Sequence, residues 1–115
     1  MTFTNPLKKP APVSEDKDLF GIIPAGEGRY HLEGELSFAS VELALKKTAE
    51  IFVSPDRMVF DLASITKVDS AGLALLLEWL RQAKAVGVEL HYTNLPRQLM
   101  AMAQVAGVDE ILIID

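Results

Sequence analysis

The chain has no cysteine and only two histidines, His31 and His91, among its 115 residues. Without cysteine there is no disulfide, no thiolate nucleophile and no cysteine-based zinc site, so a reducing compartment is expected. Both histidines fall in segments that alternate like strands, where roles at the solvent or at the core edge are favoured over metal binding. We therefore expect neither a metal ion nor another cofactor.

A basic excess is also missing, because 16 acidic residues outweigh 11 lysines and arginines and give a net charge of −5. Proteins that bind nucleic acid generally need a basic face, so nucleic acid is not an expected partner. The longest uninterrupted hydrophobic run, residues 73–77, is far short of the ~20 residues of a membrane-spanning helix. No signal-peptide pattern is present. We expect a cytoplasmic protein that would reach a membrane only through a partner.

The composition changes sharply near residue 19. Residues 1–18 hold three prolines, several charges and little to bury, which favours a disordered tail. Half of the whole chain is hydrophobic, enough for the core of one domain of ordinary size. We therefore predict a disordered N-terminal tail over residues 1–18 and a single domain over residues 19–115.

Hydrophobic periodicity predicts alternating strands and helices. Two short apolar runs around Pro-Ala-Gly-Glu-Gly indicate a hairpin, and Ser40 is a candidate cap for a helix over residues 40–54. The later elements are expected over residues 58–64 (strand), 70–86 (helix), 88–94 (strand), 96–107 (helix) and 111–115 (strand). This β-β-α-β-α-β-α-β order predicts an α/β fold with a largely parallel sheet and an antiparallel hairpin at one side.

The loop between the central strand and the longest helix reads Asp69-Ser70-Ala71-Gly72. In an open α/β sheet such a loop lies at the carboxyl edge, where function is usually found. Ser70 is a candidate helix cap, and Asp69 can do the same. Gly72 has no side chain, so another surface can come close to the backbone there.

The helix that follows is apolar on nearly every side. Its sheet-facing stripe is predicted to comprise Leu73, Leu76, Leu77, Leu80 and Ala83, with Glu78, Arg81 and Gln82 on the other side. The first two turns of that outer side carry Ala71, Ala74 and Leu75. An apolar patch beside a polar loop indicates a protein interface, although a few exposed alanines are also ordinary.

Ser70 is also a candidate phosphate acceptor. A phosphate at a helix N-terminus would meet free N–H groups and the positive end of the dipole, although Asp69 would repel it. Catalysis is not expected. Val68 stands where a nucleophile elbow needs its first glycine, and there is no glycine-rich phosphate loop.

The segment VFDLASITKVDSAGLALLLEWLRQAKAVGVELHYTN, residues 59–94, resembles the STAS domain of bacterial anti-sigma-factor antagonists. In that family an apolar strand leads into Asp-Ser-x-Gly and a leucine-rich helix, as Asp61 to Leu80 do here. The resemblance covers roughly residues 19–115. It implies the STAS fold, a small mixed and mostly parallel β-sheet flanked by helices, and a binding protein rather than an enzyme.

Two branches of this family are alternatives. DSAGLALLLEWLRQAKAVG and LPRQLMAMAQVAGVDEIL look closer to MlaB, the small cytoplasmic STAS subunit of the Mla phospholipid-transport ABC system. That resemblance implies an accessory subunit of the ATPase, in a complex with an inner-membrane permease, that helps maintain outer-membrane lipid asymmetry. The expected partner-binding residues are Asp69, Ser70, Ala71, Gly72, Ala74, Leu75, Asn94, Leu95 and Pro96.

In the anti-sigma antagonists the family's phosphorylated serine maps to Ser70. That resemblance implies a protein that binds an anti-sigma serine kinase and becomes its substrate. Antagonists more often carry Thr-Gly-Leu before the final strand, where this chain has Val-Ala-Gly-Val at residues 105–108. This departure favours the transport branch, and a STAS module of another regulatory complex is a third alternative.

Overall fold

The computed structural model describes residues 19–52 and 57–113. Four strands form one sheet in the order β1-β2-β3-β4, namely β1 (Phe20–Gly26), β2 (Arg29–Leu36), β3 (Arg57–Val68) and β4 (Glu89–Thr93). β1 pairs with β2 antiparallel, and the β2–β3 and β3–β4 pairs are parallel. The predicted hairpin and the largely parallel sheet are confirmed, whereas the predicted tail lies outside the described residues.

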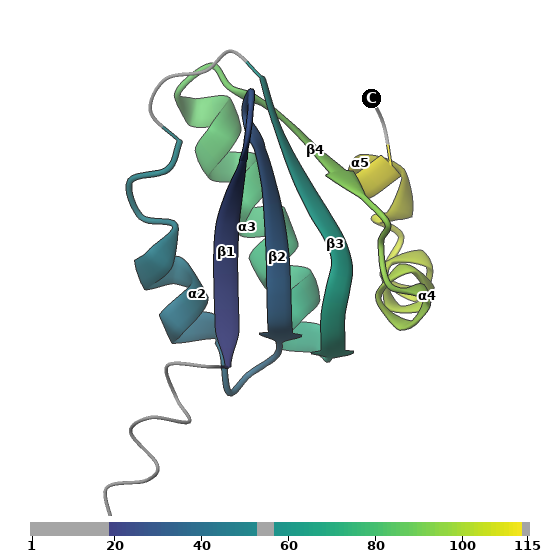
Figure 1. Ribbon diagram of the computed structural model, residues 1–115. Helices are drawn as coiled ribbons and strands as arrows, with labels where there is room; N and C mark the ends of the chain where they lie inside the picture. Colours follow the sequence, from purple (N-terminus) through teal and green to yellow (C-terminus); the bar gives the residue numbers. More distant parts are fainter. Residues whose placement is uncertain (1–18, 53–56, 114–115) are drawn as a thin grey trace, which may run out of the picture.

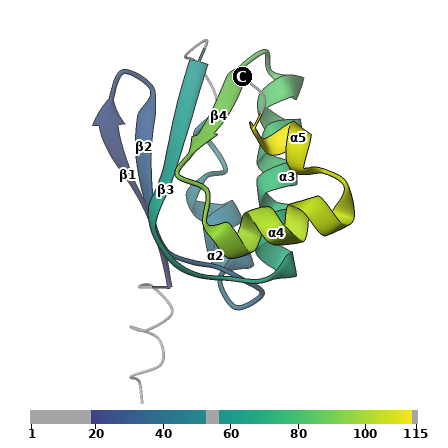
Figure 2. The same ribbon diagram turned by 90° about the vertical axis from the view of Figure 1, so that its right-hand side faces the viewer.

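Four helices complete the described part of the chain: α2 (Val41–Lys47), α3 (Ser70–Ala85), α4 (Arg97–Ala106) and α5 (Asp109–Ile113). Figures 1 and 2 show them gathered on one side of the sheet, with α4 and α5 beyond β4. The other face of the sheet is turned to the viewer in Figure 1, and none of the described helices covers it. Because β2 and β3 are parallel, the loops that follow these two strands lie at the same edge of the sheet.

The sheet's alternation separates a core face from a solvent face. In β2, Leu32 and Leu36 are buried, while His31 and Glu33 are exposed. The core centres on Trp79 of α3, whose ring meets that of Phe60 edge-on at a centroid distance of 5.3 Å. Such edge-to-face pairs are favourable beyond the area that they bury.

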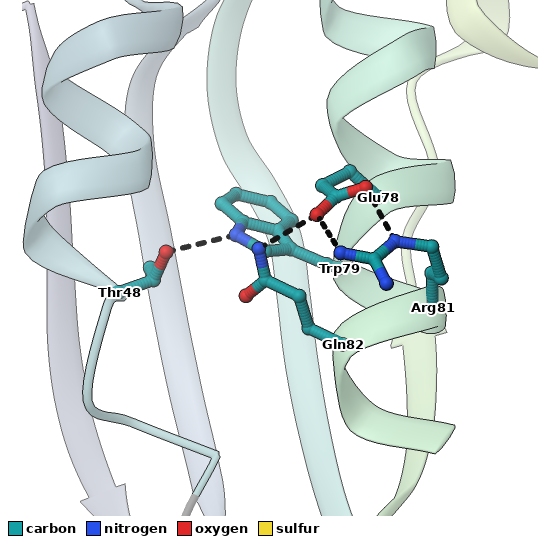
Figure 3. A network of polar contacts seen from close by, with 5 residues as sticks. All are labelled: Thr48, Glu78, Trp79, Arg81 and Gln82. Carbon is teal, nitrogen blue, oxygen red and sulfur yellow. Dashed lines mark hydrogen bonds and ion pairs between the residues drawn. The ribbon is translucent and has the colours of Figure 1, made fainter. Parts of the chain in front are cut away.

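Trp79 also connects α3 to the end of α2 (Figure 3). Its indole N–H donates to Thr48 Oγ1 at 2.9 Å, so the buried ring leaves no donor unpaired. On the outer side of α3, Glu78 accepts from both Arg81 and Gln82. The Arg81 contact, followed by that of Gln82, lowers the pKa of Glu78 to about 2. The predicted polar outer side of this helix is confirmed.

The helix predicted over residues 40–54 ends at Lys47, well before the predicted limit. At its end the Ala44 carbonyl accepts both the backbone N–H of Thr48 at 3.1 Å and the hydroxyl of the same residue at 2.8 Å, and residues 48–52 continue as turns. Ser40 does occupy the cap position, but its hydroxyl donates to the Glu35 carbonyl rather than capping.

The predicted last strand, residues 111–115, is wrong as far as the structure describes it, because Asp109–Ile113 form helix α5. An apolar run of this length cannot distinguish a strand from a buried helix by its period. The two acidic residues Asp109 and Glu110 lie in the first turn, where the helix dipole favours negative charge. This helix contacts β4, the strand at that end of the sheet.

Candidate partner-binding site

Asp69, not Ser70, caps helix α3. One carboxylate oxygen, Oδ1, accepts the backbone N–H groups of Ala71 at 2.9 Å and Gly72 at 3.3 Å. Ser70 is the first helical residue, and its side chain is exposed. Of the two candidate caps, the structure selects Asp69, and the Ser70 hydroxyl faces the surface.

The same carboxylate joins α3 to the loop after β2. Its other oxygen, Oδ2, accepts the backbone N–H of Phe38 at 3.0 Å. That N–H is the largest cause of a lowered pKa of Asp69, and the N–H groups of Ala71 and Gly72 add to it against partial burial. Asp69 is therefore ionised at neutral pH and holds two loops of the sheet edge together.

This arrangement changes the expectation for a phosphate on Ser70. The N–H groups of Ala71 and Gly72, which the sequence suggested as free donors, already donate to Asp69. A phosphate would therefore meet fewer free N–H groups than predicted, while the predicted repulsion by Asp69 remains because that carboxylate is ionised.

Gly72 is buried against the chain itself. A Cβ at this position would lie 2.1 Å from the carbonyl oxygen of Leu36 at the end of β2. The close approach inferred from the missing side chain is real, but the approaching surface is β2. Gly72 therefore serves the packing of α3 on β2, and its predicted contact with a partner stays a prediction.

The helical periodicity placed Leu75 on the outer side of α3, and this prediction is wrong because its side chain is only 2% exposed. Helix α3 packs against α2 and α4 as well as against the sheet, so more than one of its sides is buried. The other predicted members of the patch do reach the surface: Ser70 and Ala74 are exposed, and Ala71 is half-buried.

Beside Ser70, helices α3 and α4 form an apolar groove with a volume of about 450 Å³. We call it the α3–α4 groove; its lining residues are Ser70, Leu73, Gln98, Ala101, Met102, Val105 and Ala106. Val105 stands out because 91% of this apolar side chain is exposed. Phe38, in the loop that Asp69 holds, is 81% exposed.

The sequence reasoning missed the α4 wall of this groove. It used Val105 only in the comparison with the antagonists' Thr-Gly-Leu stretch. The available signal was periodicity: Leu99 and Ala103 are the buried residues of α4, and Val105 lies two positions further on, roughly on the opposite side. An apolar residue out of phase with the buried stripe indicates an exposed contact.

The predicted contact loop, residues 94–96, lies beside β3. Asn94 has a positive φ of 56° and its side-chain amide donates to Asp61 Oδ1 at 2.9 Å. Leu95 and Pro96 are half-buried and lead into α4. In the structure it is the body of α4, rather than this loop, that completes the groove beside Ser70.

The two histidines lie on different strands, each beside one acid. His31 Nδ1 is 3.3 Å from Asp61, and His91 Nε2 is 2.8 Å from Glu89. Over residues 19–52 and 57–113, no three histidine, aspartate or glutamate side chains are grouped so that they could hold a metal ion. Over the same residues, no helix is long and apolar enough to cross a membrane.

Comparison with known proteins identifies the family. The family model described as the MlaB STAS domain matches residues 24–114, most of the chain. The chain belongs to the STAS domain family. STAS domains typically act as regulatory or accessory domains that interact with partner proteins. No curated protein sequence matches the chain.

Solved structures show the same fold. The unphosphorylated anti-sigma factor antagonist SpoIIAA is 18% identical, with a TM-score of 0.64 over 82% of this chain and 85% of that protein. A sulfate transporter family protein from Wolinella succinogenes is also 18% identical, with a TM-score of 0.61 over 80% of this chain and 75% of that one. The predicted STAS fold, a mixed and mostly parallel sheet flanked by helices, is confirmed.

Proposed function

We propose that this protein is an accessory subunit of a phospholipid-transport ABC complex that maintains outer-membrane lipid asymmetry. It binds the cytoplasmic ATPase, which works with an inner-membrane permease, and so lies at the inner membrane only through that partner. The protein has no catalytic step of its own and needs no cofactor. The match to the MlaB STAS model supports this assignment over other roles of the fold.

The observation that carries the proposal is the α3–α4 groove. A side chain as apolar and exposed as Val105 gains from being covered, and burying a valine yields about 1.5 kcal/mol or more. Ser70 lines the same groove, and Ala71 and Ala74 are also small side chains at the surface of the first turns of α3, so a partner can approach this end of the helix closely. Asp69 acts indirectly by fixing this N-terminus.

Binding affects the ATPase through its conformational equilibrium. A subunit that binds the assembled or active conformation more tightly than the alternatives shifts the population towards it by that difference in affinity. The rigid corner at Asp69 and Gly72 suits this role, because a pre-formed surface loses little entropy on docking.

The test is affinity for the purified ATPase with matched variants. Val105→Asp places a carboxylate in the groove, and Val86→Asp places one on an exposed valine at the far end of α3. We expect Val105→Asp and Ser70→Glu to weaken binding at least about 10-fold, and Val86→Asp to change it little. Wild-type affinity in both groove variants would contradict the proposal.

A second candidate is an anti-sigma factor antagonist switched by phosphorylation of Ser70. One observation favours it: the Ser70 hydroxyl is exposed at the first turn of α3, within reach of a kinase. A tagged pull-down from the native host separates the two candidates. Recovery of an ABC ATPase supports transport, whereas recovery of a serine kinase together with phosphate on Ser70 supports the switch.

A further inference from the structure

Strands β3 and β4 stop pairing partway along β3. Their pairing runs from Arg57 opposite Glu89 to Asp61 opposite Thr93, and β3 then continues alone on that side to Val68. The chain leaves β4 through Asn94 and enters α4 at Arg97. The direction of α4 is therefore set within three residues of the point where the two strands separate.

Asp61 makes its contacts at this branch point. Its Oδ1 accepts the side-chain amide of Asn94 at 2.9 Å and the backbone N–H of Ala63 at 3.0 Å. Its Oδ2 is 3.3 Å from Nδ1 of His31 on β2. One carboxylate thus connects β2, β3 and the first residue of the loop that carries α4.

Asn94 is suited to this place in two ways. Its backbone has a positive φ of 56°, a conformation that asparagine adopts more readily than most residues. Its side chain supplies an N–H donor that reaches across to β3. The contact therefore ties the start of α4 to the sheet, while α5 at the other end contacts β4.

We propose that Asp61 and Asn94 are positioning residues that set the angle of α4 to the sheet and thereby the shape of the α3–α4 groove. The identity of the groove's occupant rests on the proposed function, but the positioning itself does not. On this account Asn94, predicted as a partner contact, acts on the partner through α4 rather than by touching it.

The test exploits the absence of cysteine from the chain. Spin labels on Lys84→Cys and Gln104→Cys, both exposed positions, report the distance between α3 and α4 in the free full-length protein. Asn94→Asp brings two carboxylates together. The exchange Asp61→Asn with Asn94→Asp removes the repulsion and again pairs one amide with one carboxylate, but the atom that donates to the new carboxylate can no longer accept the Ala63 N–H. His31→Ala is the matched control, since it removes another neighbour of Asp61 without touching the α4 loop.

We expect Asn94→Asp to shift or broaden the label distance by about 2 Å and the exchanged pair to return it part of the way to the wild-type value, because the Ala63 N–H stays unpaired there. Affinity for the ATPase should fall about 10-fold and recover in the same order. An unchanged distance in Asn94→Asp, no recovery in the exchanged pair, or an equal shift in His31→Ala would overturn the inference. A distance that responds while no variant, wild type included, binds the ATPase would support the positioning role and count against the proposed function alone.

Discussion

Two aspartates each fix a helix, one within strand β3 and one directly after it, and they do so by different means. Asp69, directly after the strand, accepts three backbone N–H groups and fixes α3. Asp61, in the middle, binds one backbone N–H and the side chains of Asn94 and His31, and it holds the start of α4. The groove proposed to dock the partner lies between these two helices.

This difference between the two aspartates indicates which of the two helices lining the groove can change its position more easily. Every non-proline residue supplies a backbone N–H, so the hydrogen bonds of Asp69 do not depend on the side chains of Phe38 and Ala71, and Gly72 is required only for space. The Asp61 corner depends on the identity of Asn94. We therefore expect α3 to be a fixed reference and α4 to be the adjustable wall.

The largest effect is expected from Gly72→Ala, which breaks the Asp69 corner by steric conflict. The new methyl group would meet the Leu36 carbonyl, a backbone atom that cannot rotate away. We expect a loss of about 3 kcal/mol in the free energy of unfolding, measured by urea denaturation. Gly87→Ala is the control, because it has open space but a φ of +78° and should cost only about 1 kcal/mol. Equal losses would show that space at Gly72 is not limiting.

A smaller effect is expected from removing each carboxylate in turn. Asp69→Ala loses the α3 cap and the partner of the Phe38 N–H, which should cost about 2 kcal/mol. Asp61→Ala loses contacts that water can replace at this exposed face, which should cost about 1 kcal/mol. The midpoints of urea denaturation show which variant loses more stability. A larger loss in Asp61→Ala than in Asp69→Ala would contradict the view that Asp69 is the stronger of the two anchors.

The smallest effect is a dependence on pH. The Phe38 N–H lowers the pKa of Asp69 below the ordinary value of 3.8, so the stability it adds is complete above that value. It is lost as the pH falls through the depressed pKa of the folded state. Asp69→Asn keeps one acceptor oxygen, enough for the N–H groups of Ala71 and Gly72, loses the acceptor of the Phe38 N–H, and cannot titrate. The difference in the free energy of unfolding between the wild type and Asp69→Asn should therefore shrink as the pH is lowered from about 6 to about 2. A constant difference would mean that the charge of Asp69 adds nothing.

Much of the architecture could be predicted because it follows from local patterns. The alternation of residues in β2 predicts which side of the strand is buried, and the glycine after α3 predicts where that helix ends. The order of elements follows from the same kind of signal, which acts within a few residues. The Asp-Ser-x-Gly loop was placed at the correct edge of the sheet for the same reason.

The rest depended on contacts between distant residues. Leu75 is buried because α3 has neighbours on several sides, which a single helical stripe does not represent. Gly72 faces Leu36, 36 positions earlier in the chain, and Asn94 faces Asp61, 33 positions earlier. No spacing rule brings such pairs together, so their roles could be assigned only from the fold.

The most direct test of the central claim is a hydrogen-exchange footprint of the protein with and without the purified ATPase. The account predicts slowed amide exchange in the first turns of α3 and in α4, residues 70–77 and 97–106. Amide exchange in β2, whose exposed side chains lie on the face of the sheet opposite the helices, should stay as it is in the free protein. Protection of β2 with α4 unchanged would place the partner on the opposite face and contradict the α3–α4 groove as the docking site.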